Sequence, residues 1–155
     1  MKNRGTVKAV CVSEKKGTPK TEVSRALLIR DFGIKGDAHG GKGHRQVSLL
    51  AGESIEKFRE ELTAAGMSGD IIQNGSFGEN IVTCGIDLTS LPAGSRLKIG
   101  GAELEITQIG KECHRGCIIG KTAGRCIMPE KGVFARVTAG GEVKAGDAVS
   151  VISRM

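Results

Sequence analysis

The chain has 155 residues and a formal net charge of +6, and its 24 glycines contrast with four Phe, no Tyr and no Trp. This length predicts one domain, spanning residues 1–155, that buries a core without disulfides. A basic balance favours anionic partners. Few aromatic residues are present to stack bases, and the basic residues are scattered, so we expect a phosphate-bearing small molecule rather than nucleic acid.

The compartment is expected to be the cytoplasm. Met1-Lys2-Asn3-Arg4 is not followed by an apolar run, and no stretch approaches the ~18 apolar residues of a membrane span. We therefore expect no membrane contact. The odd number of cysteines, five, fits a disulfide framework poorly.

Apolar stretches predict short strands in the first half of the chain, at residues 5–12, 22–31, 46–50 and 80–83. In the second of these, Val23, Leu27 and Ile29 are expected to share one face. A helix is predicted near residues 54–65, because Ile55, Phe58 and Leu62 form one apolar stripe. Its expected N-cap is Ser54 and its expected C-terminal stop is Gly66.

The second half of the chain carries the clearest hairpin. Leu97 and Ile99 alternate before a Gly100-Gly101 turn, and Leu104 and Ile106 alternate after it. The chain then ends in strands at 133–137, around Val143 and at 149–151, which are separated by turns at Gly140-Gly141 and Gly146-Asp147. Many short strands with one good helix predict a mainly β fold, a compact barrel with helical decoration.

Three cysteines lie close together in an otherwise irregular segment, Cys113, Cys117 and Cys126, among basic neighbours that include His114 and Arg115. Nearby cations favour a thiolate, so one interpretation is a reactive thiol that carries a persulfide or binds a soft metal. A structural zinc site is the second, although the spacing lacks the paired cysteines of common zinc modules. The third is small buried cysteines without chemistry, which also suits Cys11 and Cys84.

Two further segments could hold an anion. The glycine-rich stretch 36–45 brings His39 and Arg45 together with backbone N–H groups, although a plain surface loop fits the residues equally well. It lacks the strand–GxxxxGK[ST]–helix context of a nucleotide P-loop. Lys16 and Lys20 flank a turn that could clamp a phosphate, but a lysine-bearing turn is usually solvated.

Together these segments resemble the MOSC family, named for the C-terminal domain of molybdenum-cofactor sulfurases. The resemblance covers nearly the whole chain. It rests on the order and density of several short runs: Lys16 to Lys20, Gly36 to His39 leading into Arg45 to Leu50, Phe77 to Ile81, Leu91 to Gly94, Ile106 to Gly110 leading into Cys113 and Cys117, Gly132 to Val137, and Gly146-Asp147.

The resemblance implies a stand-alone, bacterial-type domain with a closed barrel related to the pyruvate-kinase barrel domain, carrying one or two short helices. It also implies the molybdenum cofactor, a phosphate-bearing pterin that holds its metal through sulfur. Cys117 best matches the late cysteine that carries sulfur or binds molybdenum in the family. Cys113 and Cys126 suggest a second thiol that resolves a persulfide as a disulfide.

The resemblance leaves several functions open. The leading one is a cofactor-handling or sulfur-carrying module, a sulfurtransferase-type role, with a cysteine-desulfurase-type donor protein and a molybdoenzyme or cofactor-biosynthesis protein as partners. Its pterin phosphate would be held by cationic and histidine side chains: Lys16, Lys20, His39, Arg45, His114 and Arg115. Without an aminotransferase-like domain, no pyridoxal phosphate is expected. The alternatives are a cofactor-storage protein, a molybdenum-dependent reductase of N-hydroxylated compounds, and a zinc-stabilised interaction domain.

Overall fold

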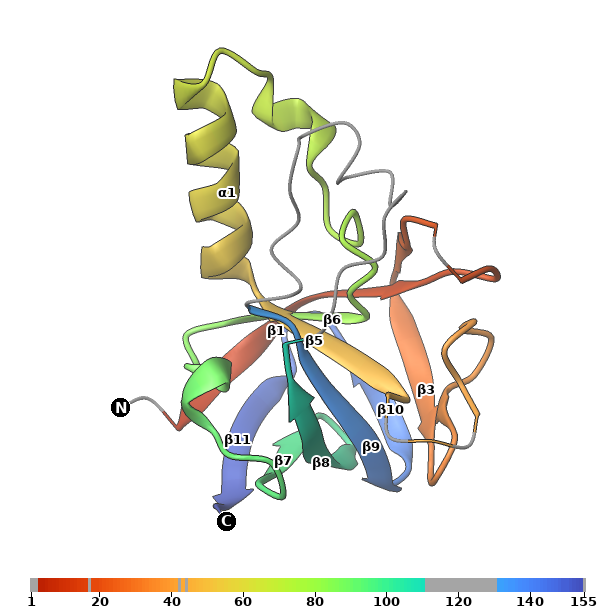
Figure 1. The fold of residues 1–155 in the computed structure, drawn as a ribbon. Helices are drawn as coiled ribbons and strands as arrows, with labels where there is room; N and C mark the ends of the chain where they lie inside the picture. The colour runs from red at the N-terminus through yellow and green to blue at the C-terminus, as the bar shows by residue number, and fades with distance from the viewer. Residues whose placement is uncertain (1–2, 17, 42, 44, 111–130, 155) are drawn as a thin grey trace.

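The computed structural model describes residues 3–16, 18–41, 43, 45–110 and 131–154. Most of the regular structure in these residues is β-strand, with one α-helix and two short 3-10 turns, η1 (Gly69–Ile71) and η2 (Leu88–Ser90). The prediction of a mainly β fold is confirmed (Figure 1).

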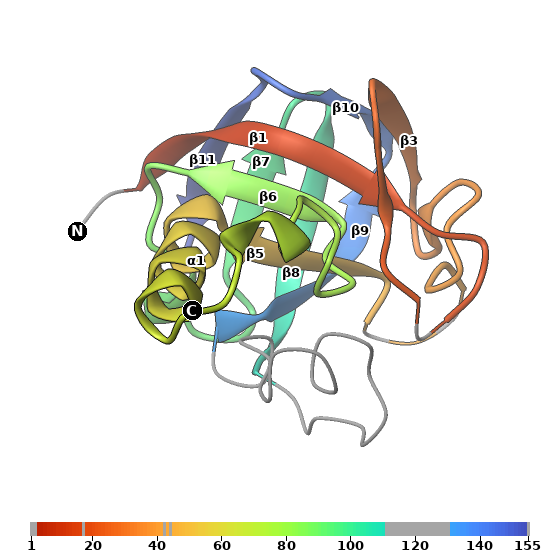
Figure 2. The same cartoon turned by 90° about the horizontal axis from the view of Figure 1, so that it is seen from above.

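Seven strands close into a barrel, which Figure 2 shows from above. In their order around the wall they are β1 (Arg4–Val12), β11 (Ala148–Ser153), β7 (Arg96–Ile99), β8 (Ala102–Ile109), β9 (Val133–Ala139), β5 (Val47–Ala51) and β6 (Ile81–Cys84). Closure comes from β1, which pairs with β11 along its first half and with β6 on its other side. The β5–β6 pair is parallel and its neighbours in the ring are antiparallel.

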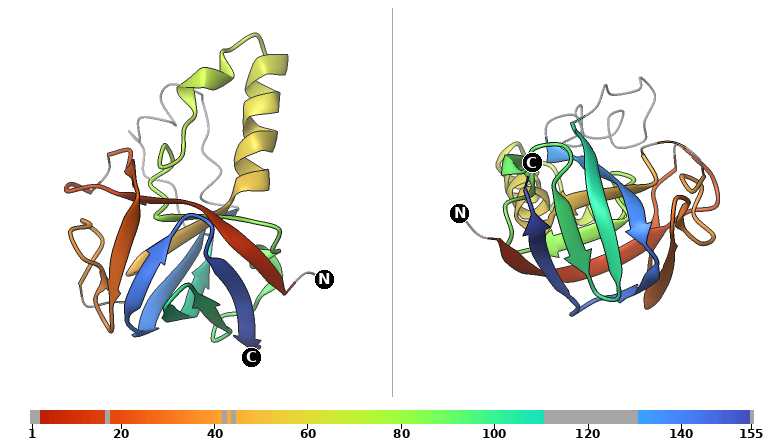
Figure 3. Two further views of the ribbon diagram at one scale, coloured as in Figure 1. Left: turned by 180° about the vertical axis from the view of Figure 1, so that it is seen from behind. Right: turned by 90° about the horizontal axis from the view of Figure 1, so that it is seen from below.

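The predicted hairpin forms the β7–β8 pair and is confirmed. Leu97 pairs with Leu104 and Ile99 with Ala102, so the alternating apolar residues share the inside of the barrel. Gly100 turns the chain with a φ of +56°, and a Cβ there would lie 2.5 Å from Asp147 Oδ2. The view from below in Figure 3 shows β11, β7 and β8 side by side, with β7 in the middle.

A second, three-stranded sheet consists of β10 (Gly141–Lys144), β3 (Arg25–Ile29) and β4 (Gly33–Ile34). The short strand β2 (Thr21–Val23) pairs with β1 at the edge of the larger sheet. Residues 22–31 therefore form two strands rather than the one predicted. The prediction of which side chains share the buried face was also wrong. Leu27 and Ile29 are exposed, whereas Ala26 and Leu28 pack in the core. The bend at Ser24 shifts the alternation by one residue, so Val23 and Leu28 can both face inward.

The helix α1 (Gly52–Ala64) covers strand faces that point away from the barrel interior, where Ala9, Leu50 and Val82 form a second core cluster. Its predicted stripe of Ile55, Phe58 and Leu62 is buried in that cluster, and each such side chain contributes about 1.5–3 kcal/mol. Phe58 also makes an edge-to-face contact with Phe77, with ring centroids 5.2 Å apart.

The predicted start of the helix was wrong and its predicted end was right. The N-cap is Ala51, because β5 runs directly into α1 and leaves Ser54 inside the first turn. Gly66 follows the last turn with a φ of +83°, and the Met67 N–H donates to the Leu62 carbonyl in the manner of a glycine-terminated helix. Within the described residues, no helix has both the length and the apolar character needed to cross a membrane.

The two cysteines expected in apolar surroundings differ. Cys11 is fully buried against α1, and burial, followed by the charges of Glu79 and Glu22, raises the pKa of its thiol to about 12. Cys84 is exposed at the end of β6, so the expectation that it is buried was wrong. Cys84 still pairs with Thr6 in the barrel wall and shares the outer face with Val82, but unlike Val82 it is not part of the cluster that α1 covers.

Candidate functional site

The side chain of Lys20 is the centre of a buried polar cluster. Its backbone N–H donates to the Gly75 carbonyl, and its side chain is fully buried. The ammonium group donates to Asp37 Oδ1 at 2.7 Å, to His39 Nδ1 at 3.0 Å and to Ser13 Oγ at 3.2 Å. Since an ammonium group has three hydrogens, these partners use all of them.

Asp37 holds the other charge of this cluster. It is fully buried, and besides Lys20 it accepts the backbone N–H groups of Ser13 at Oδ1 and of His39 at Oδ2. Burial alone would raise the pKa of the Asp37 carboxyl, but the Lys20 hydrogen bond, the two backbone hydrogen bonds and the charge of Lys20 together lower it. Asp37 is therefore a carboxylate at neutral pH, paired with the Lys20 side chain.

The cluster joins two connections that are separate in the sequence. Lys20 lies in the β1–β2 connection, whereas Asp37 and His39 lie between β4 and β5, and Figure 2 shows these connections on the same side of the barrel. The Ala38 N–H donates to the Ser13 carbonyl and fastens one connection to the other. About a third of the His39 side chain is exposed, so the ring forms the outer surface of the cluster.

Glu79 holds the loop that contacts the backbone of Lys20. Its fully buried carboxylate accepts the backbone N–H groups of Gly75 and Phe77. Burial raises the pKa of this carboxyl to about 7, against the lowering effect of those hydrogen bonds and of the Lys20 charge. Gly75 has a φ of +92°, and a Cβ there would lie 2.1 Å from the Lys20 carbonyl oxygen, so the loop requires glycine.

Arg45 is held at a second place, just before β5. Its Nε donates to Gln108 Oε1 at 3.0 Å, and its guanidinium carbon lies 5.3 Å from the centre of the Phe134 ring. Gln108 in turn donates from Nε2 to the Gly110 carbonyl at 2.7 Å. Among the described residues no acceptor is paired with the two terminal amino groups of the exposed Arg45 side chain, so both can bind an anion.

The Arg45 interactions stand next to both ends of the cysteine-bearing segment. Gly110 precedes residues 111–130, and its N–H donates to the carbonyl of Gly132, which follows them. The predicted site residues inside that range lie outside the described residues: Cys113, His114, Arg115, Cys117 and Cys126. Elsewhere, no group of three or more described His, Cys, Asp or Glu side chains is placed to hold a metal ion.

The structure thus separates the four described residues that were expected to bind phosphate. Lys20 and His39 are in direct contact, Arg45 makes its own contacts with Gln108 and Phe134, and Lys16 is exposed on the turn after β1. No role was predicted for the partners Ser13, Asp37 and Glu79. The available signals were Asp37 inside a glycine-rich loop and Glu79 between Gly78 and Asn80, just before a strand, but neither position identifies a partner.

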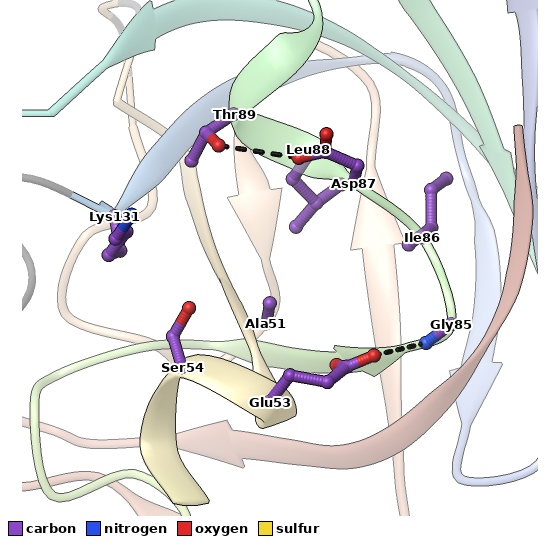
Figure 4. A pocket seen from close by; sticks show the side chains of 9 residues that line it. All are labelled: Ala51, Glu53, Ser54, Gly85, Ile86, Asp87, Leu88, Thr89 and Lys131. Atoms are coloured by element: carbon purple, nitrogen blue, oxygen red, sulfur yellow. Dashed lines mark hydrogen bonds between the residues drawn. The ribbon is translucent and has the colours of Figure 1, made fainter. Parts of the chain in front are cut away.

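A pocket of about 290 Å³ lies apart from these residues, at the start of α1 (Figure 4). Glu53 Oε2 accepts the Gly85 N–H at 2.8 Å across its floor, and Thr89 donates to Asp87 Oδ1. It is lined by Ala51, Glu53, Ser54, Gly85, Ile86, Asp87, Leu88, Thr89 and Lys131, none of which was predicted as a site residue.

These features define the chain as a small closed β-barrel domain that carries polar and cationic groups at the connections between its strands. The model of the MOSC domain matches residues 35–150, and the chain therefore belongs to the MOSC domain family. Membership of this family places the chain in molybdenum-cofactor-related function in general. No curated protein sequence matches the chain.

Solved structures of similar proteins share the fold. The YuaD protein from Bacillus subtilis is 22% identical, with all of both chains covered and a TM-score of 0.77. YiiM from Escherichia coli is 20% identical over 98% of this chain and 71% of its own, with a TM-score of 0.68. YiiM from Geobacillus stearothermophilus is 17% identical over 96% of this chain and 75% of its own, with a TM-score of 0.65.

Proposed function

We propose that the chain is a molybdenum-cofactor handling module that binds the cofactor and carries sulfur as a persulfide on Cys117. The observation that carries the proposal is the position of Arg45. Its guanidinium group is exposed, oriented by Gln108 and Phe134, and linked through Gln108 to the residue that begins the cysteine-bearing segment. A cation fixed near Gly110, which precedes that segment in the chain, suits a ligand that joins a phosphate to a thiol-binding metal.

The donor groups of the described residues fit the cofactor. A pterin phosphate needs cations that no internal carboxylate neutralises, and among the described residues Arg45 and Lys16 are exposed cations without a carboxylate partner. Lys20 is already neutralised by Asp37, so in this proposal it does not contact the phosphate. His114 and Arg115 are further proposed phosphate contacts. When bound, the cofactor supplies a molybdenum centre that accepts sulfur.

The proposed sulfur transfer moves the outer sulfur of a donor persulfide to the Cys117 thiolate. The Cys117 thiolate attacks the outer sulfur of a persulfide on a cysteine-desulfurase-type donor, the donor's S–S bond breaks, and the donor cysteine leaves as a thiolate. The oxidation level of the system is unchanged. If the Cys113 or Cys126 thiolate then attacks the Cys117 sulfur, a disulfide forms and the outer sulfur leaves as hydrosulfide. A molybdoenzyme or cofactor-biosynthesis protein is the proposed recipient.

Cofactor loading tests the binding part of this proposal. The full chain is incubated with molybdenum cofactor released from a molybdoenzyme, desalted, and assayed for bound molybdenum. We expect Arg45→Gln to weaken binding about tenfold, the effect of losing charged hydrogen bonds to one phosphate. Lys98→Gln removes an equal charge from the exposed face of β7 and serves as the matched control.

Two outcomes would contradict the binding proposal. One is wild-type protein that retains no molybdenum, and the other is Arg45→Gln protein that binds as tightly as the Lys98→Gln control. Stoichiometric zinc that is lost together with the fold on chelation would instead favour the zinc-stabilised domain. Turnover of a hydroxylamine substrate with an electron donor would favour the reductase.

A further inference from the structure

The pocket at the start of α1 combines an apolar part with charged side chains of both signs (Figure 4). Ile86 and Leu88, which are buried, form the apolar part together with Ala51. The volume of about 290 Å³ is at the lower end for small-molecule sites, so the pocket fits a small ligand. The charged side chains around it indicate which chemical class that ligand belongs to.

Two carboxylates of the pocket each have one oxygen available to a ligand. Glu53 accepts the Gly85 N–H at Oε2, at 2.8 Å, and Asp87 accepts the Thr89 hydroxyl at Oδ1, at 3.4 Å. Within the part of the chain that the structure describes, no donor is paired with Glu53 Oε1 or Asp87 Oδ2. An ammonium group, which has three hydrogens to donate, suits these two acceptors.

A cation and a hydroxyl lie at another side of the same pocket. In Figure 4 the Glu53 carboxylate extends toward Gly85, whereas Lys131 and Ser54 lie on the opposite side of the view. Lys131 is exposed, and neither its ammonium group nor the Ser54 hydroxyl has a partner among the described residues. Both groups can donate hydrogen bonds to a carboxylate. The adjacent start of α1, whose N-cap makes no side-chain hydrogen bond, also favours an anion.

We infer that this pocket binds a small zwitterion, an α-amino acid with an aliphatic side chain. The ammonium group of the ligand contacts Glu53 and Asp87, its carboxylate contacts Lys131 and Ser54, and its side chain packs on the apolar part of the pocket. No residue assigned to the molybdenum cofactor takes part in this site. The inference therefore stands or fails independently of the proposed function.

The distribution of charge distinguishes an amino acid from simpler ligands. A metal ion does not fit, because no three metal-ligating side chains come together among the described residues and Lys131 would repel it. A simple carboxylic acid would meet the repulsion of Glu53 and Asp87 without gaining their hydrogen bonds. A simple amine would leave Lys131 unpaired and close to a like charge. Only a ligand with both charges satisfies both sides of the pocket.

Titration of the ¹⁵N-labelled full chain with three related compounds tests the ligand class. L-Leucine carries both charges, 3-methylbutylamine lacks its carboxylate, and 4-methylpentanoate lacks its ammonium group. We expect leucine to shift the amide signals of Gly85 and Ser54 and to bind several-fold more tightly than either of the other two. No shift with leucine up to about 10 mM, ten times the Kd of a roughly 4 kcal/mol interaction, overturns the inference. A single-charge compound that binds as tightly as leucine also overturns it.

Three variants test which side chain holds which charge. We expect Lys131→Met to weaken leucine binding about fivefold, the effect of one exposed charged pair, without weakening the binding of the amine. Asp87→Asn should weaken the binding of both compounds, and so should Glu53→Gln, which keeps an oxygen for the Gly85 N–H. Lys98→Met, on the exposed face of β7, is the control. Equal losses of leucine and amine in Lys131→Met, or unchanged binding in both acid variants, overturn the assignment.

Discussion

Lys20 Nζ lies 2.7 Å from Asp37 Oδ1, and neither side chain is exposed to solvent. A lysine on a short turn would ordinarily be solvated, but this one closes a contact between the β1–β2 connection and the β4–β5 connection. Because the two charges neutralise each other, the pair adds little positive potential to this side of the barrel. Its main effect is to make the two connections rigid. Arg45, in the β4–β5 connection, is not paired with a carboxylate among the described residues.

Removing one charge of this pair should be more harmful than removing both. We expect Lys20→Met to lower the free energy of unfolding by about 3–5 kcal/mol, because it leaves the Asp37 carboxylate buried without its ammonium partner. The double variant Lys20→Met/Asp37→Asn should regain part of that loss. Urea denaturation measures both, with exposed Lys98→Met as the control. A double variant less stable than the single one would contradict this account of the cluster.

Glu79 predicts a loss of stability toward alkaline pH. Its pKa is raised from 4.5 to about 7, so its contribution to stability is fully present below pH 4.5 and is lost as the pH rises through about 7. Glu79→Gln cannot ionise, and its free energy of unfolding should vary less between about pH 4 and about pH 8, a range that includes both pKa values of Glu79. Denaturation at several pH values compares the slopes, and equal slopes in the two proteins would refute the prediction.

The lowered pKa of Asp37 predicts a loss of stability toward acid pH. Its pKa is lowered from 3.8, so its contribution is present above that value and is lost as the pH falls through the lowered pKa of the folded state. Asp37→Asn should remove this loss of stability at low pH. The loss of stability at higher pH, which is due to Glu79, should remain. Acid-induced unfolding followed by circular dichroism measures it. The prediction fails if the acid limb of Asp37→Asn has the wild-type steepness.

Gly75 and Gly78 offer a matched pair in one loop. Both have a positive φ, +92° and +83°, but a Cβ at Gly75 would lie 2.1 Å from the Lys20 carbonyl oxygen, whereas a Cβ at Gly78 meets no atom within 4 Å. Gly78→Ala should therefore cost only the backbone strain, about 1–2 kcal/mol. Gly75→Ala should cost clearly more, since Lys20 must also move. Similar thermal stability of the two variants would show that the loop does not support Lys20 as described.

The barrel could be predicted because its signals are local. The Leu97–Ile99 and Leu104–Ile106 alternation around two glycines, and the stripe of Ile55, Phe58 and Leu62, each specify an element within a few residues. The errors arose where a neighbour in space decides the outcome. One bend at Ser24 reversed the face of the following strand, and the direct passage of β5 into α1 moved the N-cap to Ala51.

The candidate site was predicted less completely, because its interactions join residues far apart in the sequence. Lys20 and His39 were named from their loops, but that Asp37 neutralises Lys20 depends on the packing of two connections against each other. Arg45 was named, whereas Gln108, which orients it, lies 63 residues further along the chain. Residue type indicates a capacity to bind an anion. Only the three-dimensional arrangement shows that the charge of Lys20 is already compensated, whereas Arg45 has no carboxylate partner among the described residues.

The most direct test of the proposed function is the molybdenum and labile-sulfur content of the full chain purified without reducing agent, measured on wild type and Cys117→Ser side by side. We predict molybdenum or a persulfide in the wild type after exposure to cofactor or to a persulfide donor, and its loss in Cys117→Ser. An equal load in both proteins, or neither molybdenum nor labile sulfur in the wild type, would contradict the assignment of Cys117 and of the chain as a cofactor-handling module.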